Sequence, residues 1–123
     1  MNDSVSILIN GDTHLGGGRV KDLALLNESE KLFGSFFDEI QYADISITNL
    51  ESPLTDTDNP ISKTGPNLKS PTKTLQILKD ACFNLLALAN NHIIDYGQEG
   101  LISTLKTCEK SELETVGAGN SVN

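Results

Sequence analysis

The chain has 123 residues and a formal net charge of −8 at pH 7, from 17 acidic and 9 basic side chains. A chain of this length forms at most one domain, and it can bury a core without disulfides. The acidic balance excludes an ordinary nucleic-acid binder, because phosphate contacts need Lys and Arg. The negative charge either keeps the protein soluble or includes carboxylates that bind a cation.

The ends and the cysteines of the chain carry little specific signal. No basic segment followed by an apolar stretch opens the sequence, so no signal peptide is predicted. The longest apolar run is far below the roughly 18 residues of a membrane span. The default expectation is a cytoplasmic protein, although a longer protein that contains this chain could carry a signal peptide or a membrane span. Cys82 and Cys108 are expected as small buried residues on the apolar faces of two helices.

Apolar runs alternate with segments of helical spacing along the chain. Strands are predicted at residues 5–10, 44–48, 83–89 and 113–116, and helices at 28–40, 70–82 and 97–110. The order β-α-β-α-β-α-β predicts an α/β fold with a mostly parallel sheet and right-handed crossovers. A flexible glycine loop is expected at 16–18. The polar segment 52–70 is expected to be a functional or mobile loop.

Three of the predicted strands run directly into polar side chains. The carboxyl ends of parallel strands meet at one edge of a sheet, where ligands bind. We therefore expect these side chains to lie close together. The first strand leads to Asp12 and His14, the second to Asn49 and Glu51, and the third to Asn90, Asn91 and His92, with Asp95 at the expected start of the next helix.

The residue types at these strand ends suit metal chemistry. A mixed set of nitrogen and oxygen donors from Asp12, His14, Glu51 and Asn91 suits Mn²⁺, Fe or Zn²⁺. Two such ions about 3.5–4 Å apart would activate water and hold a phosphoryl group. His92 could protonate a leaving oxygen, with Asp95 orienting its ring.

Each residue also has an ordinary structural explanation. Asp12 could be a turn residue, and Glu51 a solvated loop residue. Asn90 and Asn91 could form Asx turns before a helix, and Asp95 could be a carboxylate at a helix N-terminus. The glycine loop fits neither the P-loop nor the dinucleotide fingerprint, which disfavours a nucleotide-binding Rossmann-like domain.

Several segments together resemble the N-terminal part of the CapA family, the poly-γ-glutamate capsule biosynthesis proteins, which is similar to the calcineurin-like metallophosphoesterases. The matching segments are Gly11-Asp12 with the glycine loop, Asn49-Leu-Glu-Ser-Pro-Leu54, Leu88-Ala-Asn-Asn-His92 with Asp95-Tyr-Gly97, and Val116-Gly-Ala-Gly119. The resemblance implies that residues 1–123 are the truncated N-terminal part of one domain with a metallophosphoesterase-like αββα sandwich. An apolar face left exposed by the truncation would favour self-association.

The resemblance also implies roles for the polar residues. It places Asp12 and His14 at a first metal motif, Glu51 near a bridging carboxylate, and Asn91 and His92 as a metal ligand and a catalytic acid. Asn49 and Asn90 are expected to contact substrate. The sequence departs from the pattern in two ways, because Asn49-Leu-Glu51 replaces a Gly-Asp motif and the later histidine motifs are absent. A complete two-metal site is therefore not expected from this segment alone.

The sequence is compatible with two functions. The first is metal-dependent hydrolase or transferase chemistry on an anionic polymer or a phosphate ester in capsule biosynthesis. The second is a polymer-binding or scaffold module that keeps the fold without the chemistry.

Overall fold

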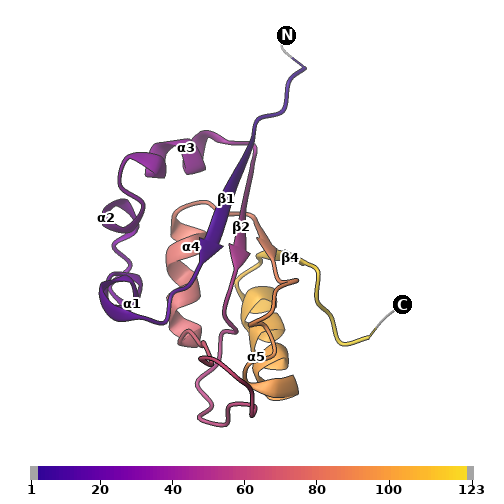
Figure 1. Ribbon diagram of the computed structural model, residues 1–123. Helices are drawn as coiled ribbons and strands as arrows, with labels where there is room; N and C mark the ends of the chain where they lie inside the picture. Colours follow the sequence, from indigo (N-terminus) through magenta and orange to yellow (C-terminus); the bar gives the residue numbers. More distant parts are fainter. Residues whose placement is uncertain (1–2, 122–123) are drawn as a thin grey trace.

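The computed structural model describes residues 3–121, which form an α/β fold around one parallel sheet. The strands are β1 (Ile7–Thr13), β2 (Ile45–Leu50), β3 (Leu85–Ala87) and β4 (Glu114–Val116), and their order in the sheet is β1-β2-β3-β4. All three neighbouring pairs are parallel, so each crossover adds the next strand on the same side (Figure 1). The predicted α/β class and parallel pairing are confirmed.

The first crossover contains more helical pieces than the sequence predicts. It holds α1 (Gly18–Leu25), α2 (Ser29–Phe33), the 3-10 helix η1 (Gly34–Phe36) and α3 (Phe37–Tyr42). The single helix predicted at 28–40 is therefore wrong. Gly34 has φ +56°, outside the α-helical region, and this breaks the helix. Helix α1 was not predicted, because its first residue lies in the glycine segment.

The later helices lie close to their predicted positions. The second crossover ends in the 3-10 helix η2 (Thr72–Leu75) and α4 (Gln76–Asp80), and α5 spans Gly97–Lys110 as predicted. The burial predicted for Cys82 is wrong: α4 ends before it, its φ is +69°, and its side chain is exposed. Cys108 is buried on α5 as predicted, and burial raises the pKa of its thiol to about 11.

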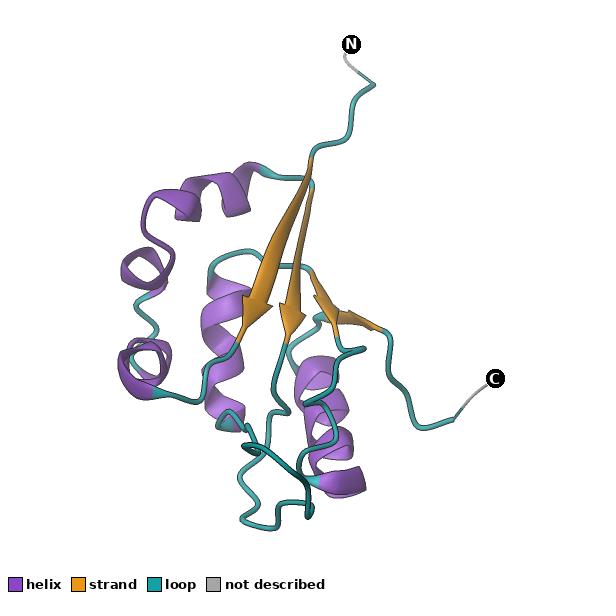
Figure 2. Ribbon diagram, in the orientation of Figure 1, coloured by secondary structure: helices purple, strands orange, loops and turns teal. Residues whose placement is uncertain are grey.

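One face of the sheet is covered by helices and holds the core. Residues Ser46, Thr48 and Leu50 of β2 are buried on this face, with Leu86 of β3. Figure 1 shows α4 and α5 behind the sheet and α1 to α3 beside β1, and Figure 2 shows the same separation of helices from strands. The largest fully buried apolar side chains are Phe83, Leu15, Leu50, Leu54, Leu75, Ile77, Leu78, Leu86 and Leu88.

The opposite face of the sheet carries apolar side chains that no described helix covers. Ile9 pairs with Ile47, and Ile47 pairs with Leu85, so one row of aliphatic side chains crosses three strands. Ile7 is 57% exposed and Ile9 is 76% exposed. A sheet with helices on a single face is consistent with part of a metallophosphoesterase-like fold. Within residues 3–121, no helix has the length and the apolar character needed to cross a bilayer.

The exposed face predicts binding of a hydrophobic dye. Apolar patches above a few hundred Å² are uncommon on monomers, so the 123-residue chain should enhance the fluorescence of an anilinonaphthalene dye and self-associate as concentration rises. Ile9→Lys should remove most of the dye signal. Leu26→Lys is the matched control, because Leu26 is 69% exposed outside the strands. A monomer without dye binding, or equal loss in both variants, would contradict this account of the face.

Candidate functional site

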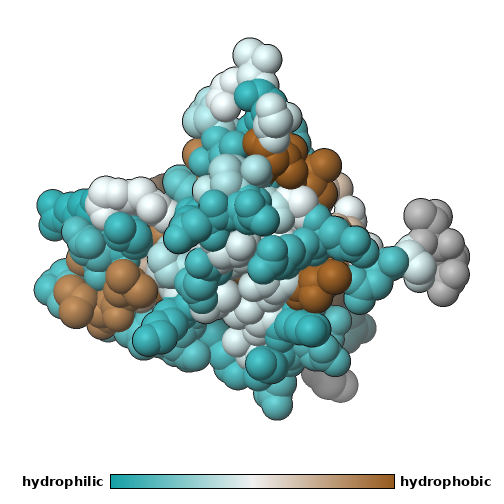
Figure 3. All heavy atoms as spheres, turned by 90° about the horizontal axis from the view of Figure 1, so that it is seen from below, coloured by the Kyte–Doolittle hydropathy of each residue, from teal (hydrophilic) through white to brown (hydrophobic). Residues whose placement is uncertain are grey.

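The carboxyl ends of the strands bring the predicted polar residues to one edge of the sheet. Asp12 lies near the end of β1, Glu51 directly follows β2, and Asn90 follows β3 within a few residues. In Figure 2 the arrowheads of the two long strands, β1 and β2, point down toward this edge. Figure 3 views the molecule from that side and shows a largely hydrophilic surface with a few apolar patches.

An irregularity in β1 turns Asp12 toward its neighbours. Ile9 pairs with Ile47 but Asp12 pairs with Asn49, so β1 carries one extra residue over this interval. Such a bulge shifts the alternation of side chains by one position. It places Asp12 on the same face as Asn49 instead of the helix-covered face. The Thr48 hydroxyl donates to the Gly11 carbonyl oxygen over 3.0 Å, which fixes the bulged backbone.

Asp12, Asn49 and Asn90 form one hydrogen-bonded row across three strands. Asn49 Nδ2 donates to Asp12 Oδ1 over 2.6 Å, and Asn90 Nδ2 donates to Asn49 Oδ1 over 3.2 Å and to the Leu50 carbonyl oxygen over 2.9 Å. Asn90 Oδ1 accepts the backbone N–H of His92 over 3.0 Å, which is the Asx turn considered from the sequence. The row connects the Asp12 carboxylate to the turn that carries His92.

His14 lies beside two buried serines that were not predicted as site residues. Its Nδ1 is 2.9 Å from Ser52 Oγ, and Ser52 Oγ is 2.7 Å from Ser70 Oγ. Burial lowers the pKa of His14 below its usual range. The Glu51 carboxylate opposes this shift and the His92 ring adds to it.

His92 and Asp95 form a close pair at the end of β3. His92 Nδ1 is 2.7 Å from Asp95 Oδ2, and the Asp95 side chain has no exposed surface. Asp95 was expected at the start of a helix, but it lies in the turn before α5, which begins at Gly97. Burial alone would raise the pKa of Asp95, but hydrogen bonds from Lys63, Leu68 and His92 outweigh it and hold that pKa below its usual range.

The segment 52–70 is fastened to this pair. Lys63 Nζ forms an ion pair with Asp95 Oδ1, and the Leu68 N–H donates to Asp95 Oδ2 over 2.7 Å. The Ile61 N–H donates to the Asp95 carbonyl oxygen over 2.9 Å. Lys63 was not predicted as a site residue, because nothing in the sequence of a polar loop distinguishes one lysine from another.

The described residues do not make a metal centre by themselves. Within residues 3–121, no three His, Cys, Asp or Glu side chains lie close enough together to hold an ion. Asn91, predicted as a ligand, is exposed. The edge supplies oxygen and nitrogen donors of the types that Mn²⁺ or Zn²⁺ accept, but not a full coordination sphere.

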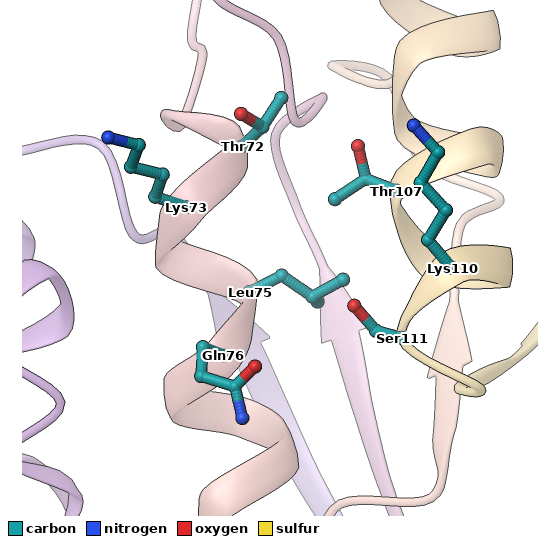
Figure 4. A pocket seen from close by; sticks show the side chains of 7 residues that line it. All are labelled: Thr72, Lys73, Leu75, Gln76, Thr107, Lys110 and Ser111. Atoms are coloured by element: carbon teal, nitrogen blue, oxygen red, sulfur yellow. The ribbon is translucent and has the colours of Figure 1, made fainter.

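A hollow in the surface lies away from these residues. It has a volume of about 410 Å³ between the η2–α4 segment and α5. Figure 4 shows Leu75 and Ser111 facing each other across it, while the Lys73 side chain points away. None of the residues predicted for the site lines this hollow, whose lining is Thr72, Lys73, Leu75, Gln76, Thr107, Lys110 and Ser111.

The contact between the glycine segment and the 52–70 segment predicts a sharp difference between neighbouring glycines. A Cβ on Gly16 would lie 1.8 Å from the Lys69 carbonyl oxygen and 2.7 Å from His14 Cε1. Gly16→Ala should cost about 1–3 kcal/mol of unfolding free energy in urea, as overpacking does. Gly17→Ala is the control, because its nearest atom would be His14 Nε2 at 3.7 Å, and it should stay within about 0.5 kcal/mol. Equal costs would contradict this packing.

The chain matches known proteins over nearly its whole length. The model of the family described as "Bacterial capsule synthesis protein PGA_cap" matches residues 6–123. The capsule biosynthesis protein CapA of Bacillus anthracis is 31% identical over 124 residues, covering 98% of this chain and 30% of the relative. The PGA biosynthesis protein CapA of Bacillus subtilis (strain 168) is 41% identical over 56 residues, covering 46% of this chain and 15% of the relative. The chain therefore spans about a third or less of these relatives, and it belongs to the CapA family of bacterial capsule synthesis proteins.

Proposed function

We propose that this edge of the sheet is part of an active site that performs metal-dependent hydrolase or transferase chemistry in capsule biosynthesis. The substrate class would be an anionic polymer, such as poly-γ-glutamate, or a phosphate ester. The observation that carries the proposal is the His92–Asp95 pair, because a histidine oriented by a buried carboxylate lies at the same edge as Asp12 and Glu51.

His92 would move the proton in this chemistry. When Nδ1–H donates to Asp95, the second ring nitrogen, Nε2, is left to exchange a proton with a substrate oxygen. Asp95 is fully buried and holds the ring in one orientation. General acid catalysis of this kind contributes about 10²–10⁴-fold to a rate.

Divalent ions of Mn, Fe or Zn would use Asp12, His14, Glu51 and Asn91 as part of their coordination, with further donors from outside these residues. Bound there, such ions would supply Lewis-acid stabilisation of negative charge. The Asn49 amide already orients the Asp12 carboxylate, which is the usual role of a group that supports a ligand.

A binding or scaffold function is the second candidate. It is favoured by the lack of any three-residue His, Cys, Asp or Glu cluster among residues 3–121. The charge of −8 repels an anionic polymer in either function unless cations lie between them, and only the enzyme proposal places cations at the site. The ordered His92–Asp95 pair also has no evident use in a passive support.

The enzyme proposal predicts different effects at two adjacent residues. In a full-length CapA protein carrying this segment, His92→Gln should lower turnover by about 10²–10⁴-fold with metal content unchanged. Asn91→Ala should lower metal content, with turnover restored in part by excess metal. The measurements are turnover on the capsule polymer and on a phosphate monoester, metal content by mass spectrometry, and melting temperature. Loss of turnover that follows melting temperature alone in both variants would favour the scaffold function.

Manganese offers a direct test of where a cation binds. Paramagnetic Mn²⁺ added to the 123-residue chain should broaden the NMR signals of Asp12, His14, Glu51 and Asn91 before others, and Asp12→Asn should weaken this broadening. Glu39 and Glu114 provide an internal control, because they lie near the amino ends of β2 and β4, at the opposite edge of the sheet. Broadening that begins at those glutamates and ignores Asp12→Asn would contradict the predicted metal residues.

A further inference from the structure

We propose that Lys63 is a positioning residue that acts through Asp95 to fix the orientation and tautomer of His92. On this proposal, which rests on the proton-transfer role proposed for His92, the pair is assembled only when segment 61–68 of the long loop is docked. Nothing in the sequence motifs assigns a role to Lys63, which lies 29 residues before His92 and 32 before Asp95.

The first argument is how completely the Asp95 carboxylate is engaged. Oδ1 forms the ion pair with Lys63 Nζ. Oδ2 accepts a hydrogen bond from the Leu68 N–H over 2.7 Å and lies 2.7 Å from His92 Nδ1. The carboxylate has no exposed surface, and a buried charge needs such partners. Lys63 takes the oxygen that His92 does not use, so it sets which oxygen faces the ring.

The second argument is the competition for His92 Nδ1. Lys63 Nζ lies 3.3 Å from this nitrogen, and Asp95 Oδ2 lies 2.7 Å from it. An ammonium group only donates and a carboxylate only accepts, so Nδ1 cannot serve both at once. The shorter contact to the charged oxygen is the stronger one, which assigns the proton to Nδ1 and leaves Nε2 free. With its charge directed to Asp95 Oδ1, Lys63 supports this assignment.

The third argument is the origin of the contacts. Three groups of the loop contact Asp95: Lys63 Nζ and the Leu68 N–H on its side chain, and the Ile61 N–H on its carbonyl oxygen. Removing the loop would strip the carboxylate of two of its three partners. Docking of the loop and assembly of the pair are therefore one event.

The test is ¹⁵N NMR of the histidine rings in the 123-residue chain, without metal or substrate. The chain has two histidines, so His14 serves as an internal reference. Lys63→Met should shift the His92 ring nitrogens away from the Nδ1–H pattern and speed hydrogen exchange at the Leu68 amide. Lys63→Arg should restore part of both signals, because it keeps the positive charge.

Lys69→Met is the matched control. Lys69 is a second lysine of the same loop, and its Nζ donates to the Thr57 carbonyl oxygen and to Asp58 Oδ1, each over 2.6 Å. It should leave the His92 nitrogens unchanged. An unchanged His92 spectrum in Lys63→Met, or an equal change in Lys69→Met, would overturn the proposal.

A double-mutant cycle covers the case in which Lys63→Met unfolds. The substitution is repeated with Asp95→Asn, whose neutral amide does not need a cation. If Lys63 acts through Asp95, it should cost much less stability in that background, and an equal cost would overturn the proposal. These measurements need no turnover. If the NMR signals change as expected but His92→Gln leaves turnover unchanged, the proposed function is rejected and the positioning role of Lys63 stands.

Discussion

The buried carboxylate of Asp95 is the group on which the arrangement of this edge depends. A carboxylate without exposed surface stays charged only if donors surround it, and its lowered pKa reflects those donors. Two of them come from the 52–70 segment and one from the His92 ring. A single charge therefore joins the turn after β3 to the middle of the loop, whose two ends are held by other contacts, of Leu54 with Thr104 and of Ser70 with Leu15.

The sheet supplies the frame within which this charge acts. Parallel pairing alone delivers three strand ends to one edge, but the bulge in β1 decides which side chain faces β2. Because of that extra residue, Asp12 meets Asn49 instead of entering the helix-covered core. The buried contact of 2.7 Å between the Thr13 and Thr48 hydroxyls lies beneath it and connects β1 to β2 at this point. A regular strand with the same sequence would have hidden the carboxylate.

The sequence was informative where the physics is local and repetitive. Apolar runs and helical spacing predicted the parallel sheet and α5, and the polar residues after each strand predicted the edge. It failed where one backbone angle or one distant partner decides the outcome. Gly34 breaks a helix through a positive φ, and Cys82 is exposed because α4 ends before it. Lys63 and Ser70 become part of the site only through tertiary contacts, which no spacing rule contains.

The row of amides gives the edge a property that bears on both candidate functions. Asn49 donates to Asp12 Oδ1, but a carboxylate has about four lone-pair sites, so Asp12 can accept a hydrogen bond and still coordinate a cation. Asn90 in turn holds Asn49 and the backbone of His92, so movement of the carboxylate would be transmitted to the turn that carries His92. The Asp12 carboxylate and the backbone of His92 are thus joined through two amide side chains, so a change at one end of the row is felt at the other.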